Sequence, residues 1–216
     1  MERFDTKINA QDIINAIPGG VAIYKVSDIF ETVYYSDGVP ELSGYDRTEY
    51  EQLIKQDAVN LTYHEDTEMV VGKIRAALAA NTAVSFDFRK QHRDGHIVWV
   101  NVYAKKIGED GGYPLLQCVF HNISAFKQSQ EELAHVINSI PGGIAAYDFT
   151  DPQNPQRLLC SDGVARLFGC SDAADLQRYA PNPWSMVFKD DYHRVYNAFQ
   201  HMFTSSETID LSYRIN

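Results

Sequence analysis

Apolar residues along the chain follow two periods, and each period predicts a different kind of secondary structure. Short runs of β-branched and aromatic residues predict five strands, at 21–24, 32–36, 84–90, 97–106 and 115–122. Between the second and third runs, apolar residues recur three or four positions apart, which predicts a long helix that ends at about Ala80. The order of these elements predicts an α+β fold, a five-stranded antiparallel sheet with helices on one face.

A few residues predict where the long helix begins and where the chain turns. Thr62 is followed by Glu65 at the spacing of a capping box, so we expect the long helix to begin there. Asp94 and Gly95 predict a tight hairpin between the third and fourth strands, and residues 108–112 predict the next turn. The apolar face of the helix is expected in the core, and it carries Val70, Val71, Ile74, Ala77 and Leu78.

The chain repeats part of its own sequence. Residues 14–24 and 137–147 share the pattern Ile-Asn-x-Ile-Pro-Gly-Gly-x-Ala-x-Tyr, displaced by 123 positions. The run Ser-Asp-Gly-Val at 36–39 recurs at 161–164, displaced by 125 positions. The two additional residues fall within 151–155, whose prolines and polar residues predict a loop. A repeat of this length predicts a duplicated domain.

The repeat predicts the domain organisation. We expect an N-terminal segment at 1–9, a first domain at 10–124, a helical linker at 125–139 and a second domain at 140–216. The second copy has no counterpart of residues 91–122, so its last two strands are expected to be absent. Such a copy has open sheet edges, and we expect it to fold poorly alone. The sequence is then interpreted as a fragment of a longer protein.

Several motifs, in the order in which they occur, resemble the PAS family of sensory domains. They are Ile17-Pro18-Gly19-Gly20, Leu42-Ser43-Gly44-Tyr45, His64-Glu65-Asp66, Lys90–Gly95 followed by Trp99, and His121-Asn122-Ile123-Ser124. Asn122 stands where the family commonly has aspartate. The resemblance covers the first copy fully and the second copy to its third strand. It implies sensing or protein interaction in a bacterial signalling protein, similar to PAS domains that precede diguanylate cyclase and histidine kinase modules.

We expect a pocket for a small-molecule ligand between the long helix and the sheet. The candidate lining residues are Tyr24, Tyr35, Val71, Ile74, Phe88, Val119 and His121. The same residues suit a core equally well, so the alternative is a pocket that side chains fill.

The linker carries apolar residues at the spacing of a coiled coil. Phe126, Leu133 and Ile140 lie seven positions apart, with Val136 and Ile137 between them. We expect a homodimer, formed through this helix or through the outer face of the sheet. The alternative is that these residues pack on the sheet of their own domain. We hypothesise that a change in the first domain passes along the helix to the part of the chain after it.

The sequence shows no cluster of catalytic or metal-ligating residues. None of the seven histidines has a cysteine or carboxylate partner at the spacing of a zinc site. Cys118, Cys160 and Cys170 lack the flavin-adduct sequence of light-sensing relatives, so no cofactor is evident and neither haem nor flavin is expected. We expect no enzymatic activity in this chain. The alternative is that it is the input part of a diguanylate cyclase or histidine kinase whose catalytic domain is missing here.

Composition narrows the class of protein further. The 216 residues include 29 acidic and 19 basic side chains, a net charge of -10 that argues against nucleic-acid binding. Three cysteines are too few for a disulfide framework and indicate a reducing compartment. No run approaches the roughly 18 apolar residues of a membrane span, and the first residues lack the pattern of a signal peptide. We therefore expect a cytoplasmic protein with no membrane segment.

Overall fold

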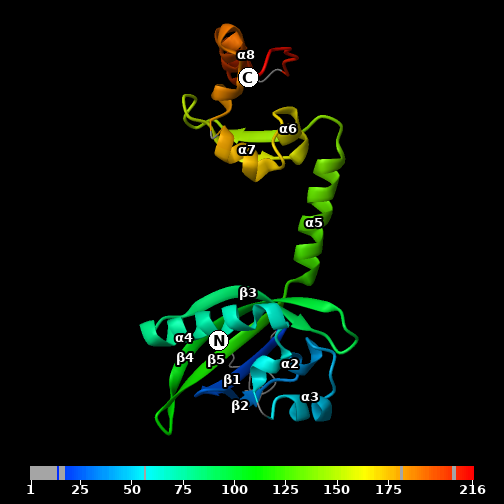
Figure 1. Cartoon of the computed structure of the whole chain (residues 1–216). Helices are drawn as coiled ribbons and strands as arrows, with labels where there is room; N and C mark the ends of the chain where they lie inside the picture. Colours follow the sequence, from blue (N-terminus) through cyan, green and yellow to red (C-terminus); the bar gives the residue numbers. More distant parts are fainter. Residues whose placement is uncertain (1–13, 15–17, 56, 181, 206–207) are drawn as a thin grey trace, which may run out of the picture. The chain divides into compact units, whose positions relative to one another are not determined.

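The computed structural model describes residues 14, 18–55, 57–180, 182–205 and 208–216. The segment expected at 1–9, most of the first residues of the expected first domain, and Ile17 of the first motif lie outside these residues. The chain divides into two compact units, Met1–Gln128 and Ser129–Asn216 (Figure 1). Each unit has its own sheet and its own helices.

The first unit contains a five-stranded antiparallel sheet. Its strands are β1 (Gly20–Val26), β2 (Phe30–Tyr35), β3 (Val84–Gln91), β4 (Ile97–Asp110) and β5 (Tyr113–Asn122). Their order in space is β2-β1-β5-β4-β3, so the first strand pairs with the last and β3 lies at an edge. All neighbouring pairs are antiparallel. The expected α+β fold and its five strands are confirmed.

The turn expected at 108–112 is shorter than the sequence pattern indicates. β4 continues to Asp110, which pairs with Tyr113 on β5, and a register shift between Lys106 and Gly108 marks the irregularity. The turn itself consists of Gly111–Gly112, with φ angles of 59° and 82°. Two adjacent residues with positive φ form the kind of tight hairpin turn that matches the twist of the strands. The strands therefore extend further than their apolar residues do.

Helices cover one face of this sheet. They are α2 (Gly38–Glu41), α3 (Arg47–Leu53), the 3-10 helices η1 (Ala58–Leu61) and η2 (His64–Asp66), and α4 (Thr67–Ala80). α4 lies across the sheet (Figure 1), and Asn81 ends it in a left-handed conformation, which is common at helix C-termini. The expected end of the long helix is confirmed.

The expected capping box at Thr62 and Glu65 is wrong. α4 begins only at Thr67, after the separate turn of η2. Thr62 instead forms an isolated β-bridge with Lys90, and the Glu65 carboxylate accepts a hydrogen bond from Arg89. Both residues therefore contact β3 and do not form the helix cap that the local pattern predicts.

Asp66 fixes the start of α4 to β3. Its carboxylate accepts a hydrogen bond from the backbone N–H of Arg89 at 2.7 Å and another from the Arg89 guanidinium at 2.6 Å. The guanidinium is the main cause that lowers the pKa of the Asp66 carboxyl group. This ion pair holds α4 in place over the sheet, where the core lies.

The core of the first unit lies between α4 and the sheet. The α4 residues Val70, Ile74 and Ala77 are buried, and Val71 and Leu78 are half-buried. On β4, alternate residues face this core, as the period of a strand requires. On the opposite face of the sheet, Ile97 is 39% and Tyr103 is 45% exposed. One face of the sheet is therefore dry and the other is partly open to solvent.

The second unit contains a two-stranded sheet in its described residues, β6 (Ala145–Asp148) and β7 (Gln156–Cys160). Its helices are α6 (Asp162–Leu167), α7 (Ala173–Tyr179), η3 (Pro183–Met186), η4 (Lys189–Asp191) and α8 (Tyr192–Ser205). Residues 208–216 form no strand, and Ile215 makes an isolated bridge with Val187.

Contacts of the first unit recur in the second unit at positions displaced by 125, the displacement seen in the sequence. The matching pairs are Asp66–Arg89 with Asp191–Arg214, and Thr62–Lys90 with Val187–Ile215. The second unit thus repeats local features of the first. That it is a second, incomplete PAS-like domain, with boundaries at 140 and 216, stays a prediction.

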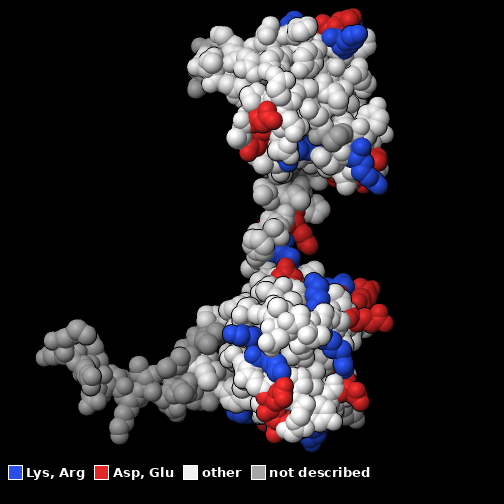
Figure 2. All heavy atoms as spheres, turned by 90° about the vertical axis from the view of Figure 1, so that its left-hand side faces the viewer, with Lys and Arg blue, Asp and Glu red and all other residues white. Residues whose placement is uncertain are grey.

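Charged side chains of both signs mix on the surface. On the face shown in Figure 2, lysines and arginines lie beside aspartates and glutamates and do not gather in one basic patch. Lys25 and Asp110, for example, form an ion pair at 2.8 Å. None of the described helices is long and apolar enough to cross a membrane.

Candidate functional site

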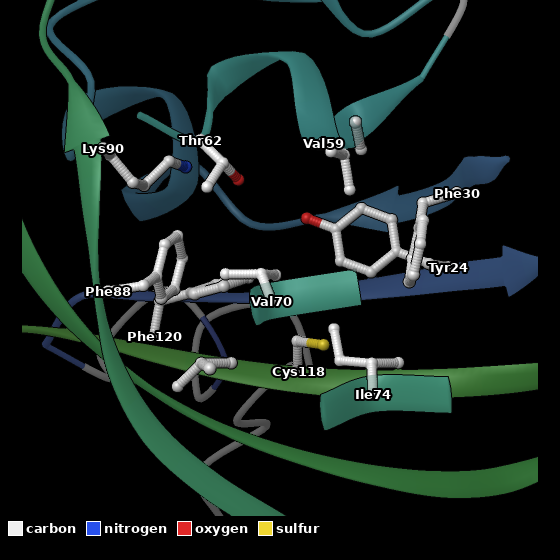
Figure 3. A pocket seen from close by; sticks show the side chains of 12 residues that line it. Tyr24, Phe30, Val59, Thr62, Val70, Ile74, Phe88, Lys90, Cys118 and Phe120 are labelled. Carbon is white, nitrogen blue, oxygen red and sulfur yellow. The ribbon is translucent and has the colours of Figure 1, made fainter. Parts of the chain in front are cut away.

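A small cavity lies in the first unit between α4, η1 and the inner face of the sheet (Figure 3). Its volume is about 40 Å³. Most of its wall is apolar, with aromatic rings from the strands and branched side chains from α4 and η1. Polar side chains also reach the wall, namely Tyr24, Thr62, Lys90 and Cys118. The cavity is therefore an apolar space with a few separate polar groups.

Three of the seven expected pocket residues line this cavity. They are Tyr24 of β1, Ile74 of α4 and Phe88 of β3, and all three are buried. Each lies on the inward face of its element, so the fold brings together side chains from three distant parts of the sequence.

The other four expected residues lie away from the wall. Val119 and His121 are on β5, where Cys118 faces inward, so the alternation of a strand directs them to the opposite face. His121 is exposed and Val119 is half-buried. Val71 is half-buried and packs against the core without reaching the cavity. These three residues therefore do not line this cavity, contrary to the expectation from the sequence.

Tyr35 lies in a groove on the outside of the first unit, between β2 and α3. Its hydroxyl donates a hydrogen bond to the Glu51 carboxylate at 2.7 Å, and the Arg47 guanidinium lies 5.3 Å from the centre of its ring. This groove is wide, about 600 Å³, and charged side chains line it. Tyr35 is therefore half-buried at this outer groove and does not line the cavity.

Sequence reasoning missed Lys90, Cys118 and Phe120, which shape the cavity from β3 and β5. Lys90 follows Phe88 by two positions, so the strand period directs both side chains to the same face. That period could have identified Lys90. Its charge, however, favours an assignment to the adjacent solvent-exposed hairpin.

The ammonium group of Lys90 lies in apolar surroundings. The residue is 5% exposed, and its Nζ lies 5.4 Å from the centre of the Phe120 ring. Burial lowers the pKa of Lys90 to about 8, because desolvation penalises the charged form. No carboxylate among the described residues forms an ion pair with it.

The other titratable groups of the cavity keep their protons at neutral pH. Burial raises the pKa of the Cys118 thiol to about 12. Burial likewise raises the pKa of the Tyr24 hydroxyl, which is hydrogen-bonded to Tyr50. With the neutral hydroxyl of Thr62, the cavity presents one cation and three neutral polar groups. This arrangement suits the binding of a ligand better than acid–base chemistry.

One group in the described part of the chain could hold a metal ion. Oδ1 of Asp94 lies 2.9 Å from Nδ1 of His92 and 2.5 Å from Nδ1 of His96. The three ligand atoms lie within 4.8 Å of one another. Sequence reasoning found no carboxylate partner for a histidine, because only the closed hairpin brings these positions together. The pKa of Asp94 is lowered to about 2, mainly by the hydrogen bond from the His96 backbone N–H. Hydrogen bonds within the turn are therefore enough to hold these three side chains together.

The helix α5 (Ser124–Ser139) covers the segment expected as a helical linker at 125–139 and begins one residue earlier. Its first turn is fixed to the sheet, because Oγ of Ser124 accepts a hydrogen bond from the backbone N–H of Trp99 at 3.0 Å. Lys127 forms an ion pair with Asp87 of β3 at 2.9 Å and lies 5.1 Å from the centre of the Trp99 ring. The root of α5 therefore contacts both β3 and β4.

Asn122 takes the place of the aspartate that the PAS family commonly has before its outgoing helix. Its Oδ1 accepts a hydrogen bond from the backbone N–H of Ser124 at 2.9 Å. An amide oxygen thus satisfies one of the free N–H groups at the start of α5, as a carboxylate would.

The expected seam residues are largely exposed. Phe126 is 60%, Leu133 61%, Val136 60% and Ile140 39% exposed, and Ile137 is half-buried. α5 buries none of its residues. The apolar side chains of α5 are therefore exposed together in the described structure.

Comparison with protein families matches residues 32–120 to the family described as PAS fold. The matched range begins in β2, ends in β5 and includes most of the cavity wall. The matched model is that of a PAS fold and not of a catalytic family. No curated protein matches the sequence.

Three solved structures illustrate what the chain is similar to. The N-terminal domain of a diguanylate cyclase with PAS/PAC sensor from Marinobacter aquaeolei is 22% identical, over 50% of this chain and 97% of that one, with a TM-score of 0.42. A sensory box histidine kinase/response regulator from Burkholderia thailandensis is 15% identical, over 54% and 86%, with a TM-score of 0.43. An RNA-binding light-oxygen-voltage receptor is 17% identical over 57% of this chain, with a TM-score of 0.47. This chain spans only 35% of that receptor.

Proposed function

We propose that residues 32–120, which form a PAS sensory domain, bind a small-molecule ligand in this cavity. We propose further that the chain is a homodimer and that α5 passes the change caused by the ligand to the part of the chain after it. The observation that carries this proposal is the short connection from the cavity wall to the linker helix. β5 contributes Cys118 and Phe120 to the wall, and it ends at Asn122, two residues before α5 begins. A shift of β5 on binding is therefore expected to move the first turn of α5.

A second contact supports the same coupling through β3. This strand contributes Phe88 and Lys90 to the wall, and its Asp87 holds Lys127 of α5 in an ion pair. The inward-facing residues of β3 thus line the cavity, and an outward-facing residue of the same strand contacts the linker helix. A displacement of β3 changes both contacts together.

Filling the cavity from β5 is expected to act on α5 in the way that a ligand does. Cys118→Leu replaces the thiol by a branched group with two methyl groups, which would occupy part of the cavity. We therefore expect the hydrogen-exchange rates of backbone amides 124–128 to change, as measured by mass spectrometry. The matched control is Leu116→Met, because Leu116 is buried on the same strand but does not line the cavity. Equal exchange rates in the two variants at 124–128 would contradict the coupling.

The seam on α5 supports a dimer of this chain. Residues seven positions apart lie on one stripe of a helix, and the same stripe on a second copy completes a parallel coiled coil. Phe126 and Leu133 on α5, with Ile140 just after the end of the helix, follow this spacing and are exposed. A second copy is therefore the partner that we propose for it.

Glutamate on the seam is expected to separate the dimer. The double variant Leu133→Glu, Ile137→Glu places two charges into the apolar stripe, and these charges cannot be buried against a like-charged partner helix. Light scattering should then give the mass of a monomer for the variant and of a dimer for the unaltered protein.

The control adds the same charges to the other side of α5. His135 and Ser139 lie about half a turn away from the stripe at roughly 100° per residue. The variant His135→Glu, Ser139→Glu should keep the mass of a dimer. A dimer in the seam variant would sink the coiled-coil proposal. A role as the input part of a diguanylate cyclase or histidine kinase stays a prediction from the sequence resemblance.

A further inference from the structure

We propose that the cavity of the first unit binds the anion of a short-chain monocarboxylic acid, with Lys90 as the counter-charge and the apolar wall around its alkyl group. The inference rests on the proposed function, because it names the class of ligand for the same cavity. It commits to a ligand with one negative charge and a short apolar body.

The observation that carries the inference is a buried ammonium group without a counter-ion. Lys90 is 5% exposed, and its Nζ faces the Phe120 ring at 5.4 Å from the ring centre. No carboxylate among the described residues pairs with it, and burial lowers the pKa of its ammonium group. An unpaired buried charge is costly, and a paired one is much less so. A bound carboxylate supplies the missing pair.

Lys90 and Thr62, which lie on bridged backbone segments, bring two polar groups to one end of the cavity. Figure 3 shows the amine of Lys90 pointing inward beside the hydroxyl of Thr62, with the hydroxyl of Tyr24 pointing inward from the other side. A charge-assisted hydrogen bond from an ammonium group to a carboxylate is among the strongest that a side chain makes. A single cation balances a single negative charge, which favours a monoanion over a phosphate or a dicarboxylate.

The remaining wall and the volume limit the rest of the ligand. Val70, Ile74 and Phe88 offer it no hydrogen bond, so an alkyl group suits this part of the wall. The volume of about 40 Å³ holds roughly three water-sized groups, since one water needs about 10–15 Å³. Acetate comes closest to this volume, and propionate and butyrate test how long an alkyl group the cavity accepts.

The second unit makes the corresponding backbone bridge without a lysine. Ile215 lies 125 positions after Lys90 and bridges to Val187, as Lys90 bridges to Thr62. It lines a hollow of about 260 Å³ that also contains Tyr213. The backbone bridge is thus made with an apolar residue as well as with a lysine, so the bridge itself does not need the charge of Lys90. Acid binding is thus assigned to the first unit.

The test is thermal unfolding of the full chain with each acid anion. Trp99 emission reports the first unit when Trp184→Phe removes the other tryptophan. We expect acetate, propionate or butyrate to raise Tm with increasing concentration, as a ligand of the folded state does. Propionamide and 1-propanol, which are neutral, and chloride at equal ionic strength should leave Tm unchanged.

Lys90→Met removes the charge while it keeps the length of the side chain. We expect this variant to lose the Tm shift, with an affinity for propionate roughly tenfold or more weaker, because the charge-assisted bond is lost. Without ligand it should melt at the same or a higher temperature, since an unpaired buried charge is gone. The control is Lys25→Met, which removes a surface lysine paired with Asp110 and should keep the shift.

The pH dependence of binding tests the same group in the unaltered protein. Affinity for propionate should fall as the pH rises through about 8, because the ammonium form of Lys90 is lost. Tyr24 and Cys118 face the cavity as well, but burial raises the pKa of both, so they stay neutral over this range. This arm decides the question if Lys90→Met does not fold.

The outcomes separate this inference from the proposed function. If propionamide raises Tm as much as propionate does, also in the Lys90→Met variant, the ligand is not recognised as an acid anion. That result would overturn this inference but would still support a ligand-binding cavity. An unchanged Tm with every probe, or a shift of Tm by propionate that persists in Lys90→Met, would also overturn the inference. The coupling of the cavity to α5 is tested separately by Cys118→Leu, which needs no ligand.

Discussion

Gly38→Ala is expected to lower the free energy of unfolding of the first unit by about 3 kcal/mol or more, the upper part of the range for an overpacked core. A methyl group on Gly38 would lie 1.7 Å from the carbonyl oxygen of Gly19, far inside van der Waals contact. That oxygen belongs to the backbone just before β1, so no side chain can rotate away. Its displacement would disturb the hydrogen bond from the Val21 N–H to Ser36 and, with it, the start of the sheet.

Urea unfolding measures this effect, with Trp99 emission as the signal in a Trp184→Phe background. The control is Gly72→Ala in α4, where an added methyl group meets no atom within 4 Å. Alanine in a helix interior is favoured over glycine by about 0.5–1 kcal/mol, so this variant should be slightly more stable. Equal stability of the Gly38→Ala variant and the unaltered protein would show that the two backbone segments are not packed as the structure has them.

Trp184→Ala is expected to destabilise the second unit by about 3–5 kcal/mol, the usual loss for a large aromatic residue in a core. Trp184 is 8% exposed and is the centre of an aromatic cluster, with Phe149, Tyr196 and Phe199 at ring distances of 5.9, 5.3 and 5.5 Å. Its indole N–H also donates to the Pro152 carbonyl at 3.0 Å. A loss of this size is a large fraction of the stability of any small domain, commonly about 5–15 kcal/mol.

Hydrogen exchange of the α8 amides reports this loss, because α8 packs against Trp184. Trp184→Phe keeps an aromatic ring and loses the hydrogen bond, so its effect should be smaller, about 1 kcal/mol. Trp99 is then the remaining tryptophan in both variants, and its urea transition should be the same in each. Unchanged protection of α8 in Trp184→Ala would mean that the aromatic cluster does not hold the second unit together.

The elements could be predicted where neighbouring residues carry the pattern. The period of two predicts the five strands, the period of 3.6 residues predicts α4, and the expected linker segment is helical. Errors occurred where a distant contact competes with a local one. The Thr62–Glu65 pattern resembles a cap, but β3 engages both residues.

The candidate site was only partly predictable, for a physical reason. Tyr24, Ile74 and Phe88 were found because large apolar residues on inward faces meet in any such core. Hydrophobicity favours Val119 over Cys118, but it does not reveal which of the alternate residues of β5 face inward. Lys90 was missed because a charge predicts exposure, whereas its strand position places it inside.

The sequence by itself determined the class of fold, the order of the elements and the internal repeat, because these depend on local periods and on comparison of the chain with itself. The tertiary structure alone decided the register of the strands, the wall of the cavity and the burial of an unpaired ammonium group at Lys90. Strand register and burial arise from pairing between segments far apart in sequence, and a one-residue shift of that pairing exchanges the inner and outer faces.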